Sequence, residues 1–82
     1  MGQQSERSRH IHLAAIFKRK RERSGLSQQQ VAEKLGVTQS WVSNVEKGAR
    51  RLDLVEGSAL AKAIGTSLIE IVAEWEGTDL ES

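Results

Sequence analysis

The chain has 82 residues, contains neither cysteine nor proline, and carries 12 Lys and Arg against 11 Asp and Glu, for a net charge of +1. This length supports one small domain with one core, and the missing cysteines exclude both a disulfide framework and a thiolate zinc site. The polar N-terminus has no apolar signal region, and no apolar run approaches the ~20 residues that cross a bilayer, so we expect a cytoplasmic protein without a membrane segment.

The charges are divided unevenly along the chain. Residues 1–53 hold eleven Lys and Arg against five Asp and Glu, whereas residues 54–82 hold one lysine against six acidic residues. A basic half suits a polyanion, which favours nucleic acid over an acidic small ligand as the partner. The run of cations from Lys18 to Arg23 also fits an ordinary solvated helix face. Its position just before the motif at residues 27–48, described below, favours nucleic-acid binding over this alternative.

The composition predicts helices throughout, because Ala, Leu, Glu, Lys, Arg and Gln dominate and no β-branched alternation occurs. Residues 1–8 are polar and without periodicity, which predicts a flexible N-terminal arm. Over residues 9–23 a stripe of Leu13, Ile16 and Phe17 predicts the first helix.

Residues 27–48 have the pattern of two short helices around a tight turn. Ser27 and Gln30 have the spacing of a capping box for the first of them, which should end at Gly36, and Thr38 can cap the second. Two helices joined by about four residues centred on a glycine are typical of the helix-turn-helix.

The C-terminal part repeats the same start signals. Asp53, with Glu56 three residues later, should open a fourth helix that ends at Gly65, and Ser67 should open a fifth. After residue 76 the periodicity ends, so residues 77–82 are expected to fray.

The fifth predicted helix is apolar around more than half of its circumference. We expect it to complete a domain spanning residues 9–76 and to provide a dimer interface through Ile69, Val72, Ala73 and Trp75. The alternative is that Trp75 closes the core of its own chain over the first helix.

The chain shows no arrangement of catalytic or metal-binding residues. His10 and His12 are two residues apart on a predicted helix, so they face different sides and cannot chelate a metal together; we expect ordinary surface residues. No set of nucleophile and base is suggested. We therefore expect no enzymatic activity, no cofactor and no small-molecule substrate.

The second helix of the motif offers the residues that could read DNA. Its apolar Val42 and Val45 must face the core, which leaves polar side chains on the outer face. Gln and Asn amides can pair with adenine N6 and N7 in the major groove, and serine can contact several base edges. The predicted base-reading residues are Gln39, Ser40, Ser43 and Asn44.

Phosphate contacts are expected from residues around this face, because backbone amides and cations bind phosphate without regard to sequence. The candidates are Gln28, Thr38, Lys47, Arg50, Arg51 and Arg19. Trp41 remains open between two roles, one in the core between the two helices of the motif and one at the rim beside DNA.

The run GLSQQQVAEKLGVTQSWVSNVEKG, with Arg21 upstream and RRLDL downstream, closely resembles the Cro/repressor-type helix-turn-helix family, also called the xenobiotic-response-element family. The resemblance covers about residues 13–75. It implies a compact five-helix bundle of the lambda-repressor-like fold that binds operator DNA, usually as a homodimer on a palindrome. It also implies an ion pair of Arg21 with Glu46, a phosphate contact by Gln28, and base contacts by Gln39, Ser40 and Asn44.

The chain departs from this family at Leu52, where proline is frequent, and at Gly57, where a larger apolar residue is frequent. Because these departures can change the path of the loop before the fourth helix, they weaken the case for phosphate contacts by Arg50 and Arg51. The sequence thus predicts an all-α regulator, a repressor that binds a double-stranded operator as a homodimer. The alternative is a protein-interaction module, such as an antitoxin or anti-regulator, that uses the apolar C-terminal helix.

Overall fold

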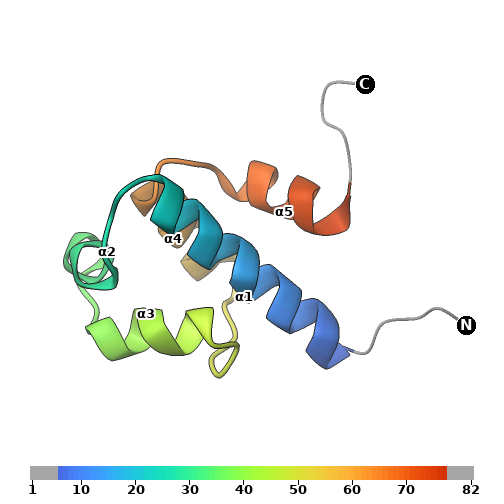
Figure 1. Ribbon diagram of the computed structural model, residues 1–82, viewed down its shortest axis with the longest axis horizontal. Coiled ribbons are helices and arrows are strands. Elements are labelled where there is room, and N and C mark those ends of the chain that lie inside the picture. Colours follow the sequence, from blue (N-terminus) through green and yellow to red (C-terminus); the bar gives the residue numbers. More distant parts are fainter. Residues whose placement is uncertain (1–5, 78–82) are drawn as a thin grey trace, which may run out of the picture.

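The computed structural model describes residues 6–77, which form five α-helices and no strand. Their bounds are α1 Glu6–Arg23, α2 Gln28–Leu35, α3 Gln39–Glu46, α4 Leu54–Ala63 and α5 Leu68–Glu76. The long α1 crosses the molecule, with α3 packed on one side and α5 on the other (Figure 1). The predicted all-α five-helix bundle is confirmed. Of the helices described, none is both long enough and apolar enough to span a bilayer.

Helix α1 begins at Glu6, three residues before the expected start. Residues 6–8 of the predicted arm are therefore helical, while residues 1–5 lie outside the described residues. Neither proline nor glycine interrupts the chain from Glu6 to Arg23, and the Glu6 carboxylate lies at the positive end of the helix dipole. Of the predicted tail, only Gly77 is described; it ends α5 with a φ of 74°.

The helix starts follow the caps that the sequence indicated. Two complete capping boxes are present, one formed by Ser27 with Gln30 and one by Asp53 with Glu56. The Thr38 hydroxyl accepts a hydrogen bond from a backbone amide of α3, and the hydroxyl at the start of α5 does the same. Each cap satisfies a backbone amide that the helix itself leaves unpaired. The residue at which each of these helices begins is therefore determined by neighbouring residues of the sequence.

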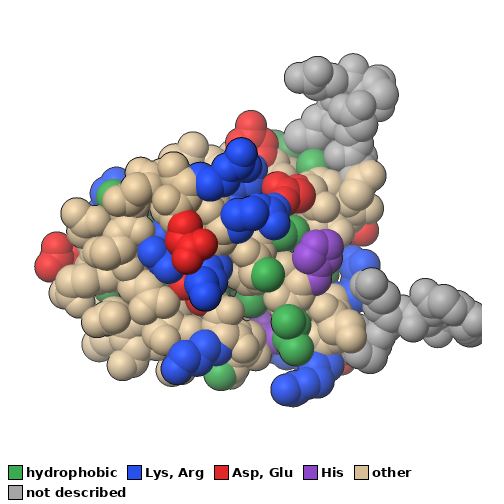
Figure 2. Space-filling model, viewed as in Figure 1, with side chains coloured by type: hydrophobic (Ala, Val, Ile, Leu, Met, Phe, Trp, Pro, Cys, Tyr) green, Lys and Arg blue, Asp and Glu red, His purple; other side chains and the backbone are tan. Residues whose placement is uncertain are grey.

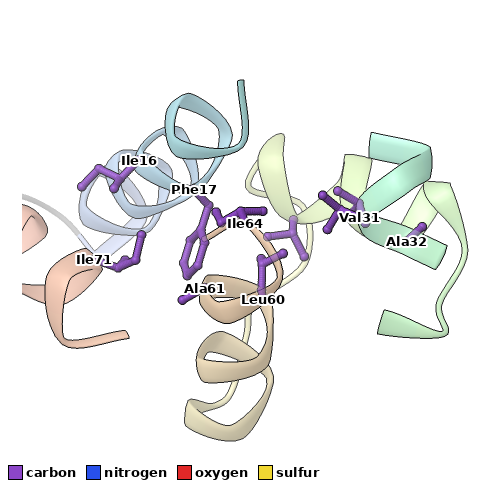
Figure 3. Packing of buried hydrophobic residues seen from close by; sticks show 10 residues of the cluster. Ile16, Phe17, Val31, Ala32, Leu60, Ala61, Ile64 and Ile71 are labelled. Carbon is purple, nitrogen blue, oxygen red and sulfur yellow. The ribbon is translucent and has the colours of Figure 1, made fainter. Parts of the chain in front are cut away.

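The core lies where all five helices meet, around the ring of Phe17. In Figure 3 this ring points toward Leu60 and Ala61 of α4, with Ile71 of α5 on one side and Val31 of α2 on the other. The two residues that should face inward from α3, Val42 and Val45, are both buried. Burial of α3 through these two side chains fixes which face of the helix remains outside.

Gly57, where the related family frequently has a larger apolar residue, lies at the contact between α4 and α5. A Cβ atom built at Gly57 would lie 3.4 Å from the Leu68 Cδ1 atom, which is ordinary van der Waals contact with the end of a flexible side chain. The backbone there is helical. The crossing therefore does not exclude alanine.

Helix α5 contacts α1 of the same chain through Trp75. The indole Nε1 donates a hydrogen bond to the Arg9 carbonyl oxygen at 2.8 Å, and the Arg9 guanidinium lies 4.4 Å from the centroid of the ring. Ala73 is buried in the core. Two of the four predicted interface residues, Ala73 and Trp75, thus make contacts within the chain, because the apolar surface of α5 packs against α1 and α4. Of the other two, Ile69 is 68% exposed and Val72 is half-buried.

Candidate nucleic-acid interface

The outer face of α3 carries the four predicted base-reading residues. Gln39, Ser40 and Asn44 are exposed, and Ser43 is half-buried. Ser40, Ser43 and Asn44 point away from the two buried valines of α3, and Gln39 lies at the flank of this face, because a helix advances 100° per residue. The helix thus presents amide and hydroxyl groups together on one surface.

An ion pair with largely buried side chains connects this helix to α1. Arg21 Nε donates to Glu46 Oε2 at 2.6 Å, and Nη2 donates to Oε1 at 3.0 Å, which is the pairing implied by the family resemblance. The side chains of Arg21 and Glu46 are only 11% and 5% exposed. A third donor, Arg21 Nη1, binds the Leu26 carbonyl oxygen at 2.8 Å. The hydrogen bonds to Glu46 raise the pKa of Arg21 above its already high ordinary value, against the opposing effect of burial.

The ion pair continues outward to the outer face of α3 through two glutamines. Gln28 Nε2 donates to Glu46 Oε1 at 2.9 Å, and Gln39 Nε2 donates to Gln28 Oε1 at 3.3 Å. A carboxylate only accepts, so it fixes the orientation of the Gln28 amide, and Gln28 in turn fixes that of Gln39. We call Arg21, Glu46, Gln28 and Gln39 the glutamine relay.

The relay leaves the Gln39 amide with its oxygen and one N–H unused. This donor and acceptor pair is what bidentate pairing with adenine needs. The sequence suggested each member separately, but not the contacts of the two glutamines, because Gln28 and Gln39 lie 11 positions apart on different helices. The periodicity of a helix predicts contacts only between residues of that helix.

The candidate phosphate-binding residues have different environments. Lys47 is exposed, and Arg51 has a side chain that is 67% exposed, with its Nη2 atom 3.9 Å from a Glu6 carboxylate oxygen. Thr38 is exposed, but its hydroxyl caps α3. Gln28 uses both ends of its amide in the relay. Lys47 and Arg51 are therefore the cations best exposed to a polyanion.

Arg50 is held within the protein instead. Its Nη2 atom lies 2.6 Å from a Glu56 carboxylate oxygen, and its guanidinium lies 5.1 Å from the ring centroid of Trp41. Trp41 is half-buried and packs against the core. Arg50 thus links the start of α4 to α3, which suits a positioning residue better than the phosphate contact that we expected.

Arg19 does not join the α3 surface. It lies two positions before Arg21, or 200° around α1, so its side chain points to the opposite side and pairs with Glu74 of α5. Lys20 pairs with the same carboxylate at 3.3 Å. In the upper half of Figure 2, Lys and Arg side chains lie beside Asp and Glu side chains. Arg19 thus takes part in an ion pair between α1 and α5, away from the outer face of α3.

The loop after α3 has one attachment that sequence reasoning missed. Gly48 has a φ of 78°, and its carbonyl oxygen lies 3.0 Å from His10 Nε2. His10 is therefore half-buried and bound to the loop, and not an ordinary surface residue like the exposed His12. Across residues 6–77 no group of three or more His, Cys, Asp or Glu side chains is placed to hold a metal ion.

Comparison with known proteins gives consistent matches. A family model described as helix-turn-helix matches residues 17–71. The HTH-type transcriptional regulator y4dJ of Sinorhizobium fredii is 34% identical over 66 residues, which cover 80% of this chain and 86% of that protein.

Two solved structures show the same arrangement of helices. An XRE-family-like protein from Pseudomonas syringae superposes with a TM-score of 0.80 at 31% identity, over 85% of each chain. The restriction-modification controller protein C.AhdI from Aeromonas hydrophila superposes with a TM-score of 0.73 at 30% identity, over 78% of this chain and 97% of that one.

Proposed function

The chain belongs to the Cro/repressor-type, or xenobiotic-response-element, family of helix-turn-helix transcriptional regulators, and from this premise we propose that it represses transcription by binding a palindromic operator as a homodimer. Members of this family are transcription regulators and not enzymes. Repression needs only occupancy of the operator, which a DNA-binding surface provides by itself. The glutamine relay is the observation that carries the proposal.

We propose that α3 lies in the major groove with Gln39 pairing to an adenine. The relay supports this role, because an amide that is already oriented loses less conformational freedom when it binds. Asn44 can read a second base in the same manner, and the hydroxyls of Ser40 and Ser43 can contact neighbouring edges. In this arrangement Glu46 stays beneath the surface and acts through Gln28.

We propose that phosphate contacts flank this face. Lys47 and Arg51 follow α3, and the first residue of α2 is Gln28, which is itself a member of the relay. Each phosphate that a cation neutralises adds about 0.9 to the negative slope of log affinity against log salt. These contacts supply affinity, while the α3 amides supply the choice of sequence.

We propose that the dimer forms through the exposed part of α5, at Ile69 and Val72. Ile69 is 68% exposed although the other apolar residues of α5 are buried or half-buried, which supports an apolar contact there. A two-fold dimer presents two copies of α3 to one side of DNA, so its half-sites should be one helical turn, or about 34–36 Å, apart.

Selection of binding sites from random DNA tests the proposal, followed by fluorescence anisotropy at two salt concentrations. A palindromic site and steep salt dependence are expected. Gln39→Ala should cost about 1–3 kcal/mol and relax specificity at one base pair, whereas Lys47→Ala should weaken all sequences alike and lower the salt slope by about 1. Gln29→Ala is the matched control, because Gln29 is an exposed glutamine of α2 that binds Glu33 at 3.2 Å and is not part of the relay.

Equal loss on every sequence for Gln39→Ala would contradict its role as a base reader, and equally weak binding to all DNA would leave the protein-interaction alternative. The dimer is tested by sedimentation of Ile69→Glu, with Val55→Glu as the control, since Val55 is 79% exposed on α4. An unchanged dimer mass for Ile69→Glu would exclude this interface. A loss of mass with both variants would show that the effect is not specific to α5.

A further inference from the structure

A pocket of about 300 Å³ opens where α1, the loop after α3 and the end of α5 meet. We propose that this α1–α5 pocket binds a small organic anion, a ring that carries a carboxylate, and that the anion weakens DNA binding. The binding site stands on the geometry of the pocket alone, and its effect on DNA rests on the proposed function. Pockets that hold small ligands have volumes of about 300–1,000 Å³, so this one suits a ligand of one or two rings.

The floor of the pocket is apolar. Leu13, Leu52 and Trp75 line it, and all three are only partly buried although they pack against the core. The core is therefore incompletely covered at this place. A flat apolar ring lying on the Trp75 indole would remove this surface from water, which is the main source of affinity for a small ligand in an apolar pocket.

The rim of the pocket is polar and supplies more positive than negative charge. Arg9 and Arg51 contribute two guanidinium groups, whereas Glu6 contributes one carboxylate. Arg9 is already bound to Glu76 at 3.5 Å and lies over the Trp75 ring. Arg51 is the cation that can turn to a ligand, because its partner among residues 6–77 is Glu6, 3.9 Å away and with a side chain that is 88% exposed.

A ligand carboxylate has an advantage over Glu6 at Arg51. It would be held by its ring on the pocket floor, so it loses less freedom on pairing than an exposed glutamate side chain does. A guanidinium can donate two parallel hydrogen bonds to a carboxylate. The chemistry of the rim therefore selects an anion, and the floor selects a ring.

A small void lies against the same residues. Its volume is about 10 Å³, and its lining combines His10, Leu13 and Leu52 of the pocket with Phe17 and with Val45 of α3. This is about the least space that holds one water molecule. The pocket thus borders on the buried side of the recognition helix, and His10, which holds the loop after α3, lines both spaces.

The anion should weaken DNA binding for a simple reason. Arg51 is one of the two best exposed candidates for a phosphate contact, and a guanidinium that is paired with a ligand carboxylate cannot serve a phosphate at the same time. The bound anion also places a negative charge beside the loop. We therefore expect the ligand to lower operator affinity and to reduce the salt slope by about one phosphate contact.

Nuclear magnetic resonance of the ¹⁵N-labelled full chain, without DNA, tests the site. The probe is 1-naphthoate, with neutral 1-naphthalenemethanol and cationic 1-naphthylmethylamine as comparisons of similar size. The indole N–H signal of Trp75, assigned with Trp75→Phe, reports on the pocket floor, and the signal of Trp41, which does not line the pocket, serves as the comparison. Naphthoate should shift the Trp75 signal saturably, with at least about tenfold tighter binding than the alcohol, as expected for a charge-assisted hydrogen bond.

Arg51→Met should weaken naphthoate about tenfold and leave the alcohol unchanged, because it removes only the charged partner. Arg23→Met is the matched control, an exposed arginine at the other end of α1, and should change neither. A Trp75 signal that does not saturate, equal binding of acid and alcohol, or tighter binding of the amine would each overturn the proposed site.

The selected operator then tests the coupling. Naphthoate should weaken binding of the unaltered protein and have no effect on Arg51→Met. Binding of naphthoate with unchanged operator affinity would overturn the coupling but leave the site. Absence of any specific operator would refute the proposed function without touching the titration at Trp75.

Discussion

Replacement of Arg21 by methionine should be strongly destabilising, although Arg21 contacts no DNA in the proposed arrangement. The change removes three hydrogen bonds and leaves the Glu46 carboxylate, 5% exposed, with the Gln28 amide as its remaining bonded partner. Breaking a buried ion pair by removing one partner costs about 3–5 kcal/mol. We expect about 3 kcal/mol, the low end, because Gln28 still donates to the carboxylate.

This loss is large for so small a domain. Native proteins are stable by about 0.05–0.15 kcal/mol per residue, or roughly 4–12 kcal/mol for a chain of this length. Urea denaturation followed by circular dichroism should show the midpoint falling without a change of slope. Arg19→Met is the matched control, since it breaks an exposed ion pair of α1 and should cost less than about 1 kcal/mol.

A double-mutant cycle separates the pair from the loss of the arginine itself. Glu46→Gln in the Arg21→Met background removes the unpaired charge, so the double variant should regain at least about 1 kcal/mol over Arg21→Met alone. Strictly additive effects, or a loss below 1 kcal/mol for Arg21→Met, would refute the reasoning. The arginine side of the pair contributes fully below its ordinary pKa and is lost only as pH rises through the raised value, so it does not titrate near neutrality.

Two further changes act through the backbone. Gly57→Ala should raise the free energy of unfolding by about 0.4–1 kcal/mol, because the residue is helical and its added Cβ makes only ordinary contact with Leu68. Gly48→Ala should lower the free energy of unfolding by more than that, because the φ of 78° disfavours a side chain. Thermal melts of the two variants compare these effects. Asp53→Ala should cost about 1 kcal/mol in the same melts, since it removes the oxygen that accepts the Glu56 amide at 2.7 Å, and an unchanged melting temperature would contradict the cap.

The sequence predicted well those features that depend on neighbouring residues. The caps at Ser27 and Asp53 were recognisable because donor and acceptor lie three positions apart. The burial of Val42 and Val45 followed from helical spacing, and it determined which face of α3 stays outside. The family resemblance added the pairing of Arg21 with Glu46, which spacing alone could not supply.

The features that the sequence did not predict are contacts between segments distant in the sequence, and the side of a helix to which a side chain points. The Trp75 indole meets the Arg9 carbonyl oxygen across 66 positions, a contact within the chain that the apolar pattern of the last helix could not indicate. Arg19 belonged to a cluster of cations, but composition does not say to which side of α1 each one points. Arg50 has Glu56 only six positions away, yet that pairing crosses a loop whose path has no periodicity.

The bond between Trp75 and Arg9 also has a consequence for the order of folding. The entropy cost of closing a loop grows as (3/2)RT ln n, so closing 66 residues costs about 0.9 kcal/mol more than closing the 25 between Arg21 and Glu46. Helices α1, α2 and α3 can therefore assemble around the shorter loop first, with α5 docking last. Amide exchange in α5 should then be faster than in α3, and α3 can persist during openings that release α5.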